Sequence, residues 1–280
     1  MRTADNVSGN SLTGHLRLLC ETRSDGASYI SKQSFRAPIH LSKSHQDAGW
    51  VIQTIVNPTA GFFDGDLLES EIEVAERAKL VLSTPSASRV YPTRSGAPAR
   101  NLQTFTVGKD AALEWIPEPF IPHAGAGYFQ KTDIHLDPSA SLLFFDWIAP
   151  GRVAKGEIFA YQNLRWELDL HIGGTLIARE RYDLDPATNS LEALKAKFPA
   201  AHYLSIYTAG IFSKNFPTNG LDALTKDDVY LGHGPLGTDS HVIRALCRDS
   251  LAARRLLENL RTMLYDAAAI PAPKLGRIFL

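Results

Sequence analysis

Carboxylates that lie within apolar runs are the side chains of this sequence best suited to chemistry. Asp146 interrupts the run Leu-Phe-Phe-Asp-Trp-Ile, and Glu114 lies within Ala-Leu-Glu-Trp-Ile. A charge in such a run must face solvent, pair with a cation or line a polar interior. Arg152 and Glu157 follow in the chain and are natural partners for such acids. Structural ion pairing is the favoured interpretation, because a buried pair that loses one partner is strongly destabilised.

Histidines offer a second chemistry, but their spacing does not favour it. His233 and His241 lie in a glycine-rich stretch that also contains Asp239. Imidazole and carboxylate suit nickel or zinc. The ligand spacing is not tight, so a solvated loop with incidental histidines is the favoured interpretation. The sequence also lacks a phosphate loop, a dinucleotide-binding glycine motif, a nucleophile elbow and an HExxH motif, which excludes the common catalytic machines.

A turn-rich decapeptide, Asn57 to Asp66, follows the strand-like run at 51–56. Pro58 ends regular pairing, and Gly61 and Gly65 permit backbone angles that are closed to other residues. Acidic side chains in such turns commonly accept hydrogen bonds from backbone amides. The local sequence therefore favours a turn-holding role for Asp66 over a ligand site.

Composition indicates one folded domain over 1–280, with residues 1–13 flexible. The chain has 44% apolar and 21% charged residues, and no linker divides it. The net charge of -1 does not provide the basic surface that nucleic-acid binding requires. Cys20 and Cys247 are far apart and form neither a disulfide framework nor a metal knuckle. With no apolar signal core or membrane-length run, we expect a cytoplasmic protein that does not bind membranes.

Alternating apolar and polar residues predict a mainly β fold. The pattern from Arg165 to Ile172 is a half-buried strand, and the pair Gly173-Gly174 predicts a tight hairpin to a returning strand at 175–181. A second antiparallel pair is predicted at 70–74 and 79–84. Stacked hairpins in layered sheets are expected, because a weak repeat of a small residue before an apolar strand start recurs, with leucines at 80, 113, 142 and 176 that are 33, 29 and 34 residues apart.

Helical patterns appear late in the chain. The segment 189–198 has a polar capping candidate in Asn189 and a stop at Pro199. The segment 250–265 is stronger, since Leu256, Leu257, Leu260 and Leu264 form one apolar stripe. The favoured interpretation is a helix that packs on the sheet, and partner binding is the alternative.

An ordered series of motifs points to one family. The motifs are NPTAGFFDGD at 57–66, STPSASRVYPTRSG at 83–96 and the long segment at 113–159. In this order they resemble the urease accessory protein UreD family, called UreH in some organisms. The similarity continues through the hairpin at 166–181 and more faintly to about residue 277. Many members have smaller residues in the first turn, where this chain has Phe62-Phe63.

The resemblance implies a non-enzymatic maturation factor with a mostly β fold. Such a protein binds apo-urease and, with the accessory proteins UreF and UreG, supports nickel delivery to the urease active site. GTP hydrolysis would then belong to UreG. No tightly bound cofactor is implied, only nickel in transit. A carbohydrate-active β-enzyme with paired carboxylates and a generic β-rich interaction module are the alternatives.

A transfer mechanism follows as a hypothesis. The carboxylates on motif or hairpin positions would line a hydrated route along which nickel passes weakly held; they are Asp66, Asp146, Glu157 and Glu180. Oxygen ligands hold nickel more loosely than a closed histidine or thiolate cage, which suits transfer. The competing hypothesis is that these acids anchor turns and ion pairs. The residues expected to shape the motifs structurally are Asn57, Pro58, Gly61, Gly65, Arg152 and Gly156.

Overall fold

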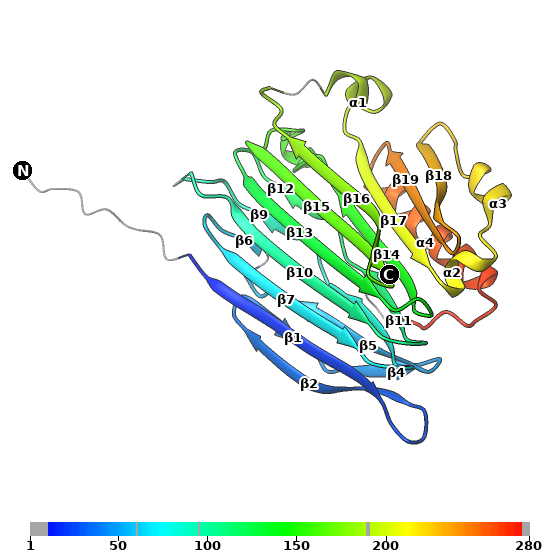
Figure 1. Ribbon diagram of the computed structural model, residues 1–280. Helices are drawn as coiled ribbons and strands as arrows, with labels where there is room; N and C mark the ends of the chain where they lie inside the picture. Colours follow the sequence, from blue (N-terminus) through cyan, green and yellow to red (C-terminus); the bar gives the residue numbers. More distant parts are fainter. Residues whose placement is uncertain (1–10, 60, 95, 189–190, 276–280) are drawn as a thin grey trace, which may run out of the picture.

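Two stacked β-sheets form most of the molecule. The computed structural model describes residues 11–59, 61–94, 96–188 and 191–275. In Figure 1 the sheets lie one behind the other, and most helices gather beside the strands from the C-terminal third of the chain. The prediction of a mainly β fold with layered sheets and a few late helices is confirmed.

The first sheet has parallel strands in its centre and a hairpin at each edge. Over the described residues its seven strands are, in spatial order, β16 (Thr175–Leu184), β15 (Asn163–Ile172), β13 (Gly127–Leu136), β10 (Ala99–Val107), β7 (Leu67–Val74), β1 (Thr13–Thr22) and β2 (Ser28–Arg36). Pairing from β15 to β1 is parallel, whereas the outermost pairs, β16 with β15 and β1 with β2, are antiparallel.

The second sheet is larger and carries the helices. Its main path over the described residues is β18 (Val229–Gly237), β19 (Ser240–Cys247), β17 (His202–Ala209), β14 (Ser141–Ile148), β11 (Ala112–Ile116), β8 (Lys79–Ser83), β5 (Trp50–Val56) and β3 (His40–Leu41). Short strands extend it: β4 (His45–Asp47), β6 (Gly61–Phe62), β9 (Ser88–Val90) and β12 (Phe120–Pro122). The helical segments are η1 (Val153–Lys155), α1 (Glu192–Lys197), α2 (Ile211–Lys214), α3 (Thr218–Asp222) and α4 (Ser250–Ala267).

The middle of the chain winds as a solenoid, alternating between the sheets. Each strand of the first sheet is followed by one of the second, in the order β7 to β8, β10 to β11 and β13 to β14. Leu113 pairs in register with Leu80 on one side and with Leu142 on the other. Three members of the predicted repeat therefore occupy equivalent positions on neighbouring strands of the second sheet. Leu176 is not, because it lies in the edge strand β16 of the other sheet.

A buried alanine explains the small residue in each repeat. Ala78, Ala111 and Ala140 lie at successive corners between the sheets and are almost fully buried. Each donates its amide to the carbonyl three residues earlier. A larger side chain would not fit where adjacent corners stack on one another.

The predicted antiparallel pairing of 70–74 with 79–84 is wrong. β7 pairs in parallel with β1 and β10, while β8 pairs in parallel with β5 and β11 in the opposite sheet. Residues 75–78 form a corner that crosses between layers instead of a hairpin turn. Strand alternation is the same in both cases, so the pattern alone does not distinguish them. The successive units are accordingly parallel coils and not stacked hairpins.

The hairpin predicted from Arg165 is confirmed. β15 and β16 pair antiparallel across Gly173-Gly174, whose φ angles of 57° and 79° are both positive. Positive φ at both central residues defines the tight turn that matches the twist of the flanking strands.

Two hydrophobic cores lie on opposite faces of the second sheet. One fills the space between the sheets, and the other lies under α4. The leucine stripe of α4, Leu256, Leu257, Leu260 and Leu264, is buried in this second core, which confirms the interpretation of a helix packed on the sheet. The carboxylate of Asp249 accepts the Ala252 amide at 2.8 Å and caps the helix.

The described residues cover only part of the helix predicted at 189–198 and of the segment 1–13 expected to be flexible. α1 begins at Glu192, within the predicted segment, but Asn189 lies outside the described residues. Residues 1–10 of the segment expected to be flexible also lie outside them, and β1 starts at Thr13. Among the helices of the described ranges, none combines the length and apolarity needed to cross a membrane.

Candidate functional site

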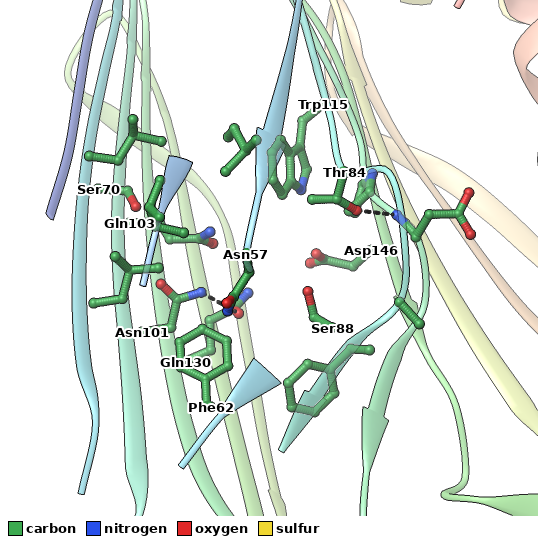
Figure 2. Close-up of a pocket in the computed structure, with 18 of the residues that line it drawn as sticks. Asn57, Phe62, Ser70, Thr84, Ser88, Asn101, Gln103, Trp115, Gln130 and Asp146 are labelled. Carbon is green, nitrogen blue, oxygen red and sulfur yellow. Dashed lines mark hydrogen bonds between the residues drawn. The ribbon is translucent and has the colours of Figure 1, made fainter. Parts of the chain in front are cut away.

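The space between the sheets is polar at its centre. Figure 2 shows Asn57, Asn101 and Gln130 with their amides directed towards a small cavity that the Asp146 carboxylate and the Ser88 hydroxyl also face. The cavity has a volume of about 90 Å³, which leaves room for a few water molecules. A polar pocket with room for water therefore interrupts the apolar core.

A ladder of buried amides and hydroxyls lines the side of this pocket formed by the first sheet. Asn101 on β10 donates to Gln130 Oε1 on β13 at 3.2 Å, and Tyr128 donates to the same oxygen at 3.0 Å. Thr132 donates to Gln103 Oε1 at 3.1 Å. The Asn101 Oδ1 atom is buried and has no hydrogen-bond partner among the described residues. The ladder thus leaves one buried acceptor unpaired among the described residues.

Asp146 is the acid of this pocket. It lies on β14, is only 6% exposed, and accepts one hydrogen bond, from Trp166 Nε1 on β15 at 3.3 Å. Burial raises the pKa of the Asp146 carboxyl to about 7, against the Trp166 hydrogen bond, and the charge of Glu180 adds to the rise. At neutral pH the group is therefore poised between its two protonation states.

Glu180 lies on β16 and receives far more hydrogen bonds. Tyr182 and Tyr207 donate to its carboxylate, and Ser205 donates to Oε2 at 3.4 Å. The guanidinium of Arg244 lies 2.9 Å from Oε1. Burial raises the pKa of Glu180, and Arg244 opposes this rise. Glu180 is therefore a buried carboxylate with one cationic partner.

The structure brings Asp146 and Glu180 together from opposite sheets. Ser205 on β17 is the register partner of Asp146 and also donates to Glu180, so it connects the two acids. Beyond Glu180, a more open cavity of about 700 Å³ is lined by Tyr182, Tyr203 and Arg244 together with many apolar side chains. The acids therefore lie between a small polar pocket and a larger opening.

Asp66 lies elsewhere and holds the Asn57 to Asp66 turn. Its Oδ1 accepts the Leu12 amide and its Oδ2 accepts the Phe63 amide, both at 2.8 Å. Asn57 donates to the Gly61 carbonyl at 3.2 Å. A Cβ on Gly61, whose φ is 155°, would lie 2.2 Å from the Arg89 carbonyl oxygen, so this close approach requires glycine. Pro58 and Gly65 lie within the same turn region.

Glu157 pairs with Arg152, so neither residue is the partner of Asp146 or Glu114 that the sequence suggested. Arg152 donates from Nε to Glu157 Oε2 at 2.7 Å, and the Ala124 amide donates to the same oxygen at 3.1 Å. The hydrogen bond from Arg152 is the main reason why the pKa of Glu157 falls to about 2. Gly156, with a φ of 74°, ends η1 between the two partners. Asp66 and Glu157 thus serve local structure, apart from the Asp146 and Glu180 pair.

The histidines near the C-terminal third do not form a metal cage. His233 Nε2 lies 2.9 Å from Asp222 Oδ1, whereas the ring of His241 stacks on Phe216 at 3.9 Å. Across the described residues there is no cluster of three or more His, Cys, Asp or Glu side chains able to hold a metal ion. The interpretation of a solvated loop is wrong, because His233 lies in β18 and His241 in the paired strand β19, and α3 supplies Asp222 as the partner of His233.

Sequence reasoning missed the groups around the two acids. Asn101 and Gln103 occupy the same alternate positions of β10 as the buried Phe105, which is a readable signal for polar side chains inside the sandwich. Tyr207 and Arg244 beside Glu180 have no such signal, because they come from β17 and β19, far along the chain.

Fold and site together define a class of protein: a layered β-scaffold with a polar internal pocket and two neighbouring buried carboxylates. A family model described as UreD urease accessory protein matches residues 12–277. The chain belongs to the UreD urease accessory protein family.

Individual relatives agree with this assignment. A urease accessory protein UreD from Opitutus terrae is 36% identical over 258 residues, covering 91% of this chain and 94% of that protein. One from Acetivibrio thermocellus is 26% identical over 249 residues, covering 86% and 94%. One from Kocuria rhizophila is 35% identical over 161 residues, covering 57% and 44%. The resemblance inferred from the motifs is confirmed.

Proposed function

We propose that this protein supports urease maturation as a non-catalytic scaffold that passes nickel through its interior. The observation that carries the proposal is the pairing of Asp146 and Glu180, two buried carboxylates contributed by opposite sheets and connected through Ser205. They stand between a small hydrated pocket and a larger cavity. This arrangement gives a divalent cation two successive oxygen sites inside the fold.

The chemistry of the pair suits transfer better than storage. Carboxylates and water bind nickel less tightly than a closed set of imidazoles or thiolates. Because burial raises the pKa of Asp146 to about 7, this carboxyl gives up its proton near neutral pH when a cation arrives. A proton can return when the cation leaves, which reduces the negative charge that the empty pocket retains.

Partners follow from the family. The proposal includes binding to apo-urease and joint action with UreF and UreG in the cytoplasm. GTP hydrolysis is assigned to UreG, since this sequence has no phosphate loop. Nickel is cargo in this scheme and not a resident cofactor.

The proposed route is narrower than the one expected from sequence. Both oxygens of Asp66 accept backbone amides, and Glu157 is held by Arg152, so neither carboxylate is offered to the central pocket. We therefore restrict the transfer role to Asp146 and Glu180. A carbohydrate-active site has less support. The cavity that Asp146 lines has a volume of about 90 Å³, well below the roughly 300 Å³ where small-molecule sites begin, and the larger cavity is lined mostly by apolar side chains and by neither acid.

The test replaces Asp146 with Asn and Glu180 with Gln in a ureolytic host. Each variant keeps the shape of its side chain but removes the charge. We expect the variants to co-purify with urease subunits and UreF as the wild type does, while the nickel content and activity of urease fall. Normal nickel loading with normal assembly would refute the interior route.

A matched control separates charge from location. Asp169 on β15 is also a largely buried carboxylate, but it faces Arg179 and Arg181 outside the sandwich. Asp169→Asn should leave nickel loading of urease unchanged once folded protein is compared at equal amounts. Failure of any form of the protein to co-purify with urease components would instead count against the maturation role itself.

A further inference from the structure

We propose that the outer face of the first sheet carries a binding site for a divalent transition-metal ion, formed by His135 and His171. The two residues are register partners on the parallel strands β13 and β15. Their rings stack with centroids 4.9 Å apart and an angle of 14° between the planes. This site is separate from the interior pair of acids and does not depend on it.

Strand geometry brings both imidazoles within reach of one ion. Register partners on neighbouring strands have backbones roughly 5 Å apart and side chains on the same face. Rotation about the side-chain bonds then allows one nitrogen of each ring to approach a common ion. Imidazole is a suitable ligand for nickel, copper and zinc, whereas magnesium prefers oxygen ligands.

His135 is accessible, and His171 has a ring nitrogen without a hydrogen-bond partner among the described residues. His135 is exposed and His171 is half-buried. The Nδ1 atom of His171 is buried without a hydrogen-bond partner among the described residues. A side-chain nitrogen left in this state can gain a metal ligand bond without giving up a hydrogen bond.

Neighbouring acids are already engaged, so the site has two protein ligands. Asp133, two residues before His135, lies 3.0 Å from Lys131 Nζ. Asp169, two residues before His171, is held by Arg179 and Arg181. The described residues contain no cluster of three metal-ligating side chains, which agrees with this count. Water would complete the coordination sphere, giving an open and readily exchanged site.

Isothermal titration with nickel chloride, on the untagged full-length protein, tests the proposal. His135→Asn and His171→Asn should each weaken nickel binding at this site by about tenfold or more. The double variant should bind little more weakly than either single one, because chelation requires both rings. Zinc should behave as nickel does, and magnesium should not bind.

His15 provides the matched control. It lies on β1 of the same sheet, where its Nε2 is 2.8 Å from the Ser34 hydroxyl, and it has no histidine register partner on β2 or β7. His15→Asn should leave the titration unchanged. Equal loss in this variant, or an unchanged titration in both His135→Asn and His171→Asn, would overturn the proposal.

A second measurement avoids reliance on the variants. In the wild-type protein, ring-proton NMR signals of His135 and His171 should broaden first as nickel is added, ahead of those of His15. Broadening that is uniform over all histidines would refute a specific site. Asp146→Asn should retain this outer-face binding, so failure of the interior route and failure of the histidine site give different results.

Discussion

Glu114 and Asp146 are buried acids in the same sheet, yet they have opposite surroundings. Glu114 on β11 is fully buried beneath α4, where Arg261 donates to both of its oxygens, at 2.5 and 3.0 Å, and Tyr265 donates at 2.6 Å. Asp146 on β14 faces the other core and, from the described residues, accepts a single hydrogen bond, donated by Trp166. One carboxylate is saturated, and the other has unused hydrogen-bonding capacity beside a cavity.

The difference separates a structural acid from a functional one. A buried carboxylate with a bidentate arginine and a tyrosine fixes the position of a helix. A buried carboxylate with one weak hydrogen-bond partner is destabilised in its ionised form, and it can still bind a proton or a cation. Both residues lie in apolar runs of the sequence, so burial alone does not distinguish the two roles. The partners do.

The largest expected effect tests whether α4 is an integral part of the fold. Leu260 belongs to the buried leucine stripe of α4 and is completely buried, so Leu260→Asp places an unpaired charge in the second core. We expect the free energy of unfolding to fall by more than about 5 kcal/mol, which would leave little folded protein. Soluble yield and urea unfolding measure this. Leu251→Asp on the same helix is the control, because Leu251 is 71% exposed and should tolerate the change.

Glu114→Gln tests the saturated acid. The substitution keeps the side-chain volume but leaves Arg261 as a buried cation without its counterion. We expect the free energy of unfolding to fall by about 3 to 5 kcal/mol. Urea denaturation at neutral pH measures the change, with the exposed pair Arg17 and Glu71 as reference, where Glu71→Gln should have no measurable effect. A stable Glu114→Gln protein would contradict the structural role.

Asp146→Asn should stabilise the folded protein at alkaline pH, in contrast to Glu114→Gln. The pKa of Asp146 is raised to about 7 in the folded state from 3.8, so the folded protein retains a proton that the unfolded chain loses between these values. Stability is therefore complete below about pH 4 and declines as the pH rises towards 7. Relative to the wild type, the free energy of unfolding of the variant should rise by on the order of 4 kcal/mol between pH 4 and pH 8.

Chemical denaturation of both proteins across that range isolates the contribution of Asp146. All other titrating groups are shared, so their effects cancel in the difference between the two stability curves. A difference that does not change with pH would show that Asp146 titrates normally. In that case the contrast between the two buried acids would disappear.

Sequence patterns anticipated much of the fold because the signals are local. The β15 and β16 hairpin follows from alternation and Gly173-Gly174, and α4 follows from its leucine stripe. The crossing from β7 to β8 was misjudged because corner and hairpin have the same flanking strands. Only the pairing partners, which lie further along the chain, distinguish them.

The candidate site was less predictable. Asp146 is noticeable in the sequence because it interrupts an apolar run. Glu180 lies between two arginines, a pattern typical of an exposed residue. Its burial depends on Tyr207 and Arg244, 27 and 64 residues later in the chain. Likewise, the partner of Glu114 is 147 residues away. Contacts across layers at such separations leave no periodic trace in a single sequence.

Asp66 gives the smallest effect and tests which kind of acid the first turn contains. Asp66→Asn retains one acceptor oxygen but presents an amide group to the second backbone N–H, so one of the hydrogen bonds from Leu12 and Phe63 is lost. We expect the free energy of unfolding to fall by about 1 to 2 kcal/mol, which is the cost of leaving a buried donor unpaired. Thermal unfolding measures it. Because both oxygens serve the backbone, nickel loading of urease should match the wild type at equal amounts of folded protein. Reduced loading without lost stability would place Asp66 with Asp146 instead of with Glu114.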